Sequence, residues 1–233
     1  MTLDNFLNIF KDRKIVAFGE THHGQHTSFF NKLSNNLDRF NGVFLEMPVS
    51  DQPSVNYYLK NGNFDDRLKG LIAGAMGEGK DIESTTKAIL DYGKIVPIVC
   101  IDSSKKQDDI YKNKSIHGYY FHKGNSRDED MFKNIVEKYK EGERWVLISG
   151  AKHLELGSHH RSHEKTLGTR LKERFGEELF RVCLTTNEDG TKEIDEVACY
   201  LDREGGITEA SYLSQFDAYI VTPSYLALSP VFS

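Results

Sequence analysis

Carboxylate and imidazole side chains, which serve both acid–base chemistry and metal binding, follow the apolar runs of this sequence. They are Glu20, His22, His23, Glu46, Asp102 and His153. A histidine with a flanking carboxylate can act as a general base, because the acid fixes its tautomer. Two or three histidines with a glutamate or aspartate can instead bind a divalent metal that activates water. Both kinds of chemistry stay open at this point, and Glu20 or Glu46 could also simply accept backbone hydrogen bonds in a turn.

The elements that must position these residues alternate along the chain. The predicted strands are residues 15–19, 42–47, 95–102, 145–150, 179–185, 197–201 and 218–222. The predicted helices are residues 29–37, 84–92, 129–139 and 166–175. This alternation is typical of an α/β fold with a mainly parallel β-sheet flanked by helices on both faces. Because such sheets bind their ligands at the carboxyl ends of the strands, we expect the polar residues to meet at that edge.

The last third of the chain departs from the alternation. An Asp-Gly pair at residues 189–190 lies between the predicted strands 179–185 and 197–201, and this pair is a hairpin turn signal. We therefore expect an antiparallel C-terminal edge. No linker rich in proline, glycine or serine interrupts the sequence, so residues 1–233 are predicted to form a single domain.

Composition excludes several classes of protein. The net charge of −5 argues against a nucleic-acid binder, which needs a basic face, and no apolar run is long enough for a membrane span. Residues 1–10 lack the features of a cleaved secretory signal. The cysteines Cys100, Cys183 and Cys199 lie in or beside apolar runs, which is typical of buried free thiols in a reducing compartment. We expect a cytoplasmic protein with neither nucleic acid nor membrane as a partner.

One helix start carries an unusual cation. Ser126 and Glu129 have the spacing of a capping box, and Asp128 suits the positive end of the helix dipole. Arg127 opposes that dipole. We therefore expect a carboxylate or an anionic ligand to hold it in place.

Other conspicuous residues receive plainer interpretations. His26 is expected at the surface, and the histidines at residues 159–163 in a solvated loop. Residues 74–80 resemble a phosphate-binding loop, but Asp81 replaces its serine or threonine. We predict a flexible loop over residues 70–80.

Four motifs resemble those of the superfamily that joins erythromycin esterases, ChaN-like heme-binding lipoproteins and TraB/TIKI proteins. They are Gly-Glu-x-His-His-Gly at residues 19–24, Phe-Leu-Glu-Met-Pro at 44–48, Arg-Asp-x-x-Met at 127–131 and Leu-Ile-Ser-Gly-Ala-Lys-His-Leu at 147–154. The resemblance implies the erythromycin esterase/ChaN-like fold. His22 aligns with the ChaN and TIKI type, and His23 with the esterase type.

This resemblance leads to a hydrolase of ester or amide bonds as the first hypothesis, with a small molecule or a peptide as substrate. Its catalytic residues would be His23 as the base, Glu20 or Glu46 to orient it, Arg127 to stabilise the oxyanion and His153 as a second acid or base. No serine or cysteine stands in a nucleophile-elbow context, which favours direct attack by water.

Two alternatives use the same edge of the sheet. In a metal-assisted version, His22, Glu46 and His153 bind a divalent metal. In a non-enzymatic version, the site binds heme or a metal, or the protein is an effector that acts through a host protein partner. Superfamily members also occur as toxin domains and bacterial effectors, which implies a virulence effector delivered into a host cell without a cleaved signal peptide.

Overall fold

The computed structural model describes residues 12–20, 26–76, 80–103, 127–158, 164–186, 199–201 and 215–222. Its strands are β1 (Ile15–Glu20), β2 (Gly42–Pro48), β3 (Ile98–Asp102), β4 (Trp145–Gly150), β5 (Leu179–Thr186), β6 (Cys199–Leu201) and β7 (Ala218–Thr222). Its α-helices are α2 (Thr27–Ser34), α3 (Gln52–Asn61), α4 (Asp66–Met76), α5 (Lys80–Leu90), α7 (Arg127–Lys138), α8 (Ala151–Leu154) and α9 (Leu167–Phe175). Within these residues, no helix has the length and apolar character that a bilayer crossing requires.

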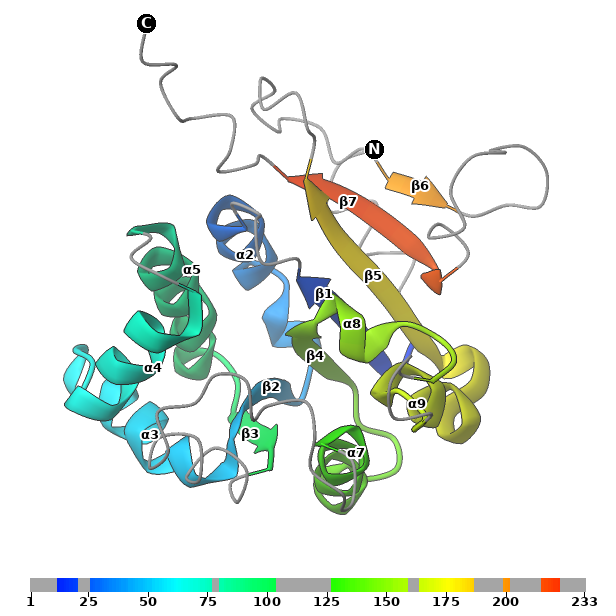
Figure 1. Ribbon diagram of the computed structural model, residues 1–233, viewed down its shortest axis with the longest axis horizontal. Coiled ribbons are helices and arrows are strands. Elements are labelled where there is room, and N and C mark those ends of the chain that lie inside the picture. Colours follow the sequence, from blue (N-terminus) through cyan, green and yellow to red (C-terminus); the bar gives the residue numbers. More distant parts are fainter. Residues whose placement is uncertain are drawn as a thin grey trace, which may run out of the picture.

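The strands of the described residues form one sheet in the order β3-β2-β4-β1-β5-β7-β6 (Figure 1). Neighbouring strands run parallel from β3 to β7, and β6 runs antiparallel to β7. Parallel neighbours need crossover connections, and helices lie in the connections that lead from β1 through β2, β3 and β4 to β5. The predicted α/β fold, with a mainly parallel sheet and an antiparallel edge, is confirmed.

The antiparallel pair of the C-terminal edge is β6 with β7, and not β5 with β6 as the turn signal between residues 179–185 and 197–201 suggested. β5 pairs in parallel with β7, with Val182 opposite Ala218, so β7 lies between β5 and β6. Val182 and Ala218 are both fully buried, and this placement keeps β5 in the interior of the sheet. The Asp-Gly pair that favoured the hairpin lies outside the described residues.

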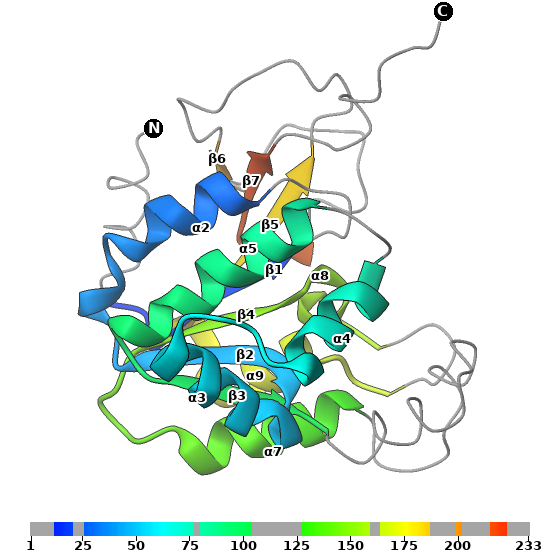
Figure 2. The same ribbon diagram turned by 90° about the vertical axis from the view of Figure 1, so that its left-hand side faces the viewer.

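Successive residues of the central strands face two separate helical layers, because strand side chains alternate between faces. Val16 and Phe18 of β1 belong to a core that α2, α3, α4 and α5 cover, whereas Ile15 and Ala17 belong to a core under α7, α8 and α9. Figure 2 shows the first group of helices on the side that faces the viewer. The prediction of helices on both faces is confirmed.

The flexible loop predicted over residues 70–80 is wrong in its first part, which α4 occupies. Leu68 of α4 is fully buried, and Leu71 packs against the core of the first helical layer. Burial of this apolar face outweighs the low helix propensity of Gly70. Residues 77–79 lie outside the described part of the chain.

The expected surface position of His26 is also wrong, because only 2% of its surface is exposed. His26 precedes α2, and its ring meets Phe30 edge-on with the ring centroids 6.3 Å apart. α5 packs against the start of α2, where the hydroxyls of Thr27 and Thr85 lie 2.7 Å apart. The burial of His26 therefore follows from helix packing.

A side chain covers the outer edge of β3, the last strand on its side of the sheet. Gln52, the first residue of α3, donates from Nε2 to the Ile98 carbonyl at 3.1 Å. Its Oε1 accepts the Cys100 N–H at 2.9 Å. One amide thus satisfies two backbone groups that a sheet edge otherwise leaves without a strand partner.

The short helix α8 follows β4 directly, which puts His153 at the carboxyl end of the sheet. α9 packs closely against it. The hydroxyl of Thr166, the N-cap of α9, donates to the Glu155 carbonyl at 2.5 Å. A Cβ atom on Gly168 would lie 2.2 Å from the Leu154 carbonyl oxygen. Only a glycine allows this approach.

We expect Gly168→Ala to lower the free energy of unfolding by about 1–3 kcal/mol, because the new methyl meets backbone atoms that cannot move aside independently. Gly70→Ala in α4 is the control, since no atom lies within 4 Å of its added Cβ. That variant should be more stable by up to about 1 kcal/mol. Urea unfolding of both variants measures the difference, and equal stabilities would contradict the close packing.

Candidate active site

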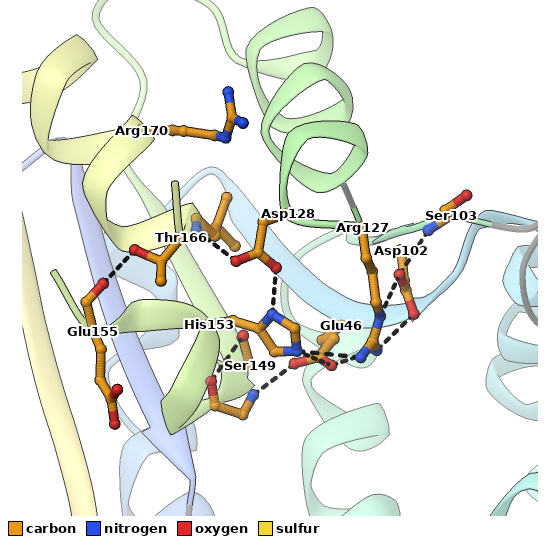
Figure 3. Close-up of polar contacts among 12 residues, drawn as sticks. Glu46, Asp102, Ser103, Arg127, Asp128, Ser149, His153, Glu155, Thr166 and Arg170 are labelled. Carbon is orange, nitrogen blue, oxygen red and sulfur yellow. Dashed lines mark hydrogen bonds and ion pairs between the residues drawn. The ribbon is translucent and has the colours of Figure 1, made fainter. Parts of the chain in front are cut away.

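The carboxyl edge of the sheet brings together the predicted residues that the structure describes, and Figure 3 shows four of them, Glu46, Asp102, Arg127 and His153. Glu46 lies near the end of β2, and Asp102 ends β3. Arg127 begins α7, and His153 lies in α8 after β4. Glu20 ends β1, and its carboxyl is close enough to Glu46 for the two charges to interact. Since β3, β2, β4 and β1 are successive neighbours, their ends form one continuous edge.

Arg127 is the charged centre of this group. Its Nε and Nη2 atoms donate to the two carboxylate oxygens of Asp102 at 2.8 and 2.7 Å. Nη2 also donates to Glu46 Oε1 at 2.5 Å, and Nη1 lies 3.1 Å from His153 Nε2. Bidentate arginine–carboxylate pairs are strong and orient both partners. The expectation that a carboxylate holds Arg127 is confirmed, and two carboxylates do so.

Glu46 is an anion at neutral pH. Burial raises the pKa of its carboxyl, but the charges of His153 and Arg127 and a hydrogen bond from Gly150 outweigh this effect and lower the pKa to about 2. The Gly150 N–H donates to Oε2 at 2.6 Å and thereby ties β2 to the end of β4. The position and the charge of Glu46 are both fixed by its neighbours.

Glu20 experiences the opposite electrostatic environment. Burial first, and the negative charge of Glu46 second, raise the pKa of its carboxyl to about 7. At neutral pH the carboxyl of Glu46 is therefore ionised, whereas the adjacent carboxyl of Glu20 gains and loses a proton. Pairs of titratable groups whose pKa values are driven apart in this way are typical of acid–base sites.

The His153 ring has partners at both nitrogens. Nδ1 contacts Asp128 Oδ1, and Nε2 faces Arg127 Nη1 and, at 3.4 Å, Glu46 Oε1. Burial lowers the pKa of the imidazole. The charge of Glu46 and the hydrogen bond to Asp128 raise the pKa by more than burial lowers it, so the pKa lies above that of an ordinary histidine. His153 therefore favours the protonated state more than a free histidine does.

Asp128 is a site residue for which the sequence pattern predicted only a helix-dipole role. Its side chain is 1% exposed. Oδ1 contacts His153, and Oδ2 accepts the Leu167 N–H at 2.9 Å. The signal that could have found it is the Arg-Asp-x-x-Met motif at residues 127–131, where it stands beside Arg127.

Several predicted residues lie outside the part of the chain that the structure describes. They are His22, His23, Ser126 and the histidines at residues 159–163. The assignment of His22 or His23 to the site therefore stays a prediction.

The metal-assisted alternative requires His22, Glu46 and His153 to share one ion. Among the described residues, no group of three histidine, cysteine, aspartate or glutamate side chains is arranged to hold a metal. The Arg127 guanidinium contacts both Glu46 Oε1 and His153 Nε2. It thus supplies positive charge where an ion shared by these two residues would lie.

No protein-family model and no curated protein matches the amino-acid sequence. Solved structures match through their fold. The type III effector HopBA1 is similar over 95% of this chain and 93% of its own, with a TM-score of 0.57 and 11% identity. Erythromycin esterase EreC is similar over 95% of this chain and 79% of its own, with a TM-score of 0.56 and 11% identity.

A third similar structure is RRSP, a MARTX toxin effector domain from Vibrio vulnificus CMCP6, with a TM-score of 0.51 and 19% identity. The match covers 79% of this chain and 36% of the RRSP chain, so this chain spans about a third of the toxin's length. Identities this low establish architecture alone. The chain therefore has the fold that erythromycin esterase EreC shares with these effector and toxin domains, as the resemblance of its motifs implied.

Proposed function

We propose that this chain is a hydrolase of ester or amide bonds in which water attacks the substrate directly. The observation that carries the proposal is the mutual contact of Glu46, Arg127 and His153 at the carboxyl edge of a parallel sheet. Ligands of α/β proteins bind at this edge. The fold shared with an erythromycin esterase supports the same class of reaction.

His153 is suited to carry the proton that the leaving group needs. Its Nε2 has both a donor, Arg127 Nη1 at 3.1 Å, and an acceptor, Glu46 Oε1 at 3.4 Å. The neutral ring can accept from Arg127, and the protonated ring can donate to Glu46. Both protonation states therefore find a partner in the same geometry, which a general acid requires as it releases and regains its proton.

The group that activates water lies at or just after the end of β1. Glu20 has a pKa of about 7 and can accept a proton from water at neutral pH. His23, three residues further along, is the other candidate for this base and keeps the role that the sequence motif implied. Glu46 stays ionised and orients the base that takes the proton, whether this base is Glu20 or His23.

Arg127 supplies positive charge next to the atom that exchanges the proton. Negative charge that develops on a substrate oxygen at this position is stabilised electrostatically. The two cysteines of the described core are unsuited to act as nucleophiles, because burial raises the pKa of Cys100 and of Cys183 to about 12. Direct attack by water agrees with this set of groups.

The biological setting that we propose is that of a bacterial effector. The type III effector HopBA1 has the same fold over almost its whole length, and RRSP is a toxin effector domain. A small molecule or a peptide of a host cell would then be the substrate, and the chain would act inside that cell.

We expect His153→Asn, Glu46→Gln and Glu20→Gln each to lower the rate of ester or amide cleavage by about 100-fold or more, because each removes a proton carrier or its fixed counter-charge. A panel of nitrophenyl esters and peptide amides provides the measurement. Glu129→Gln is the matched control, since Glu129 lies on α7 and its carboxylate pairs with Lys133 at 2.7 Å and with Arg170 at 3.8 Å.

Variants that retain the wild-type rate on every substrate that the wild type cleaves would refute the hydrolase. Loss of activity after chelation, restored by one divalent metal, would favour the metal-assisted version. An inactive wild type that develops a Soret band with hemin would favour ligand binding. A cellular phenotype that survives all three substitutions would favour action through a host protein.

The raised pKa of Glu20 also predicts a pH-dependent stability. A folded-state pKa of about 7, against 4.5 for an ordinary glutamate, stabilises the fold below pH 4.5, and this contribution is lost as the pH rises through 7. Glu20→Gln should therefore gain stability relative to the wild type between pH 5 and pH 8, by about 3 kcal/mol at most. Urea unfolding across this range is the test, with the exposed Glu83→Gln as control. A difference that does not grow with pH would contradict the assignment.

A further inference from the structure

We propose that Asp128 is the positioning residue that sets the tautomer and orientation of His153, and that the start of α9 holds Asp128 in place for this purpose. The geometric part stands on the contacts of the described residues. The catalytic consequence rests on the proposed function.

Both oxygens of Asp128 are engaged, and in different directions. Oδ1 contacts Nδ1 of His153, whereas Oδ2 accepts the Leu167 N–H at 2.9 Å (Figure 3). The carboxylate is 1% exposed, so water does not compete for either oxygen. A buried carboxylate with two fixed partners has a single orientation.

This arrangement determines which nitrogen of His153 carries the proton. A carboxylate at Nδ1 accepts a hydrogen bond only if that nitrogen is protonated, because the opposite tautomer would place a lone pair against the anion. Nε2, which faces Arg127 and Glu46, is then the nitrogen that gains and loses the exchangeable proton. Asp128 therefore acts on one nitrogen of the ring, and Arg127 and Glu46 face the other.

The start of α9 is a fitting anchor for a carboxylate. Leu167 is the first residue of α9, and its N–H has no acceptor within the helix. The positive end of the helix dipole also favours an anion there. Thr166, the N-cap of α9, donates to the Glu155 carbonyl just beyond α8 at 2.5 Å. One helix start thus fixes both Asp128 and the segment that carries His153.

A purely structural role for Asp128, as a cap for α9, explains only one of its oxygens. The hydrogen bond from the Leu167 N–H uses Oδ2 alone. A capping role therefore does not explain why Oδ1 faces the imidazole of His153. Asp130 offers a direct comparison, because it also belongs to the first turn of α7 but has no place in the site. A substitution at Asp130 changes the charge at the helix start without touching His153.

The test is to follow the nitrogen-15 signals of the imidazole of His153 across pH in the wild type, in Asp128→Asn and in Asp130→Asn. In the wild type and in Asp130→Asn, the neutral ring should carry its proton on Nδ1. In Asp128→Asn, the tautomers should mix or invert, and the titration midpoint of His153 should fall by about one pH unit or more. On a cleaved ester, kcat should fall by about 100-fold with KM little changed.

An unchanged tautomer and midpoint in Asp128→Asn would overturn the proposal. If that variant does not fold, the wild type still decides, because a neutral ring protonated on Nε2 contradicts the assignment. A changed tautomer without hydrolysis by any form of the protein would uphold the positioning role and refute the proposed function, so the two failures are distinguishable.

Discussion

The buried carboxylate of Asp102 and the half-buried carboxylate of Glu46 at the end of the sheet require a cation between them, and Arg127 is that cation. An unpaired buried charge costs several kcal/mol, and this cost explains why an arginine occupies a helix start whose dipole it opposes. Its guanidinium joins Glu46 at the end of β2 to Asp102 at the end of β3, and it also contacts His153. Three segments far apart in the sequence therefore depend on one side chain for their charge balance.

His153 owes its position to neighbours rather than to its own helix. α8 has four residues, too few to be stable alone. Its last carbonyl, that of Leu154, accepts Arg181 Nη1 at 3.1 Å, and the buried Arg181 also donates to Gln215 at 2.6 Å. β5 and the segment before β7 thus hold one side of α8, while α9 holds the other. Rigid support of this kind is what the catalytic role proposed for His153 requires.

Local sequence patterns predicted those features that depend on the residues of one segment alone. Apolar β-branched runs predicted the strands. Positions near or just after the strand ends predicted that Glu46 and His153 lie at one edge of the sheet, because parallel strands share one carboxyl edge. The same patterns failed where distant contacts decide. β5 pairs with β7, a strand much later in the chain, and α5 packs against the start of the helix that follows the buried His26. The contacts of Asp128 come from a histidine and a helix start that only the fold brings near.

The amide of Gln52 has a consequence for the protein in solution. A sheet grows when an exposed edge strand pairs with a strand of another molecule, and this is a common route to aggregation. At β3, the backbone groups of Ile98 and Cys100 that would form such a ladder are already bonded to one side chain of the same chain. Recruitment of a foreign strand there would first have to displace α3 from its place. The Ile98 carbonyl and the Cys100 N–H of the edge strand that ends at Asp102 are thereby unavailable for pairing with another molecule.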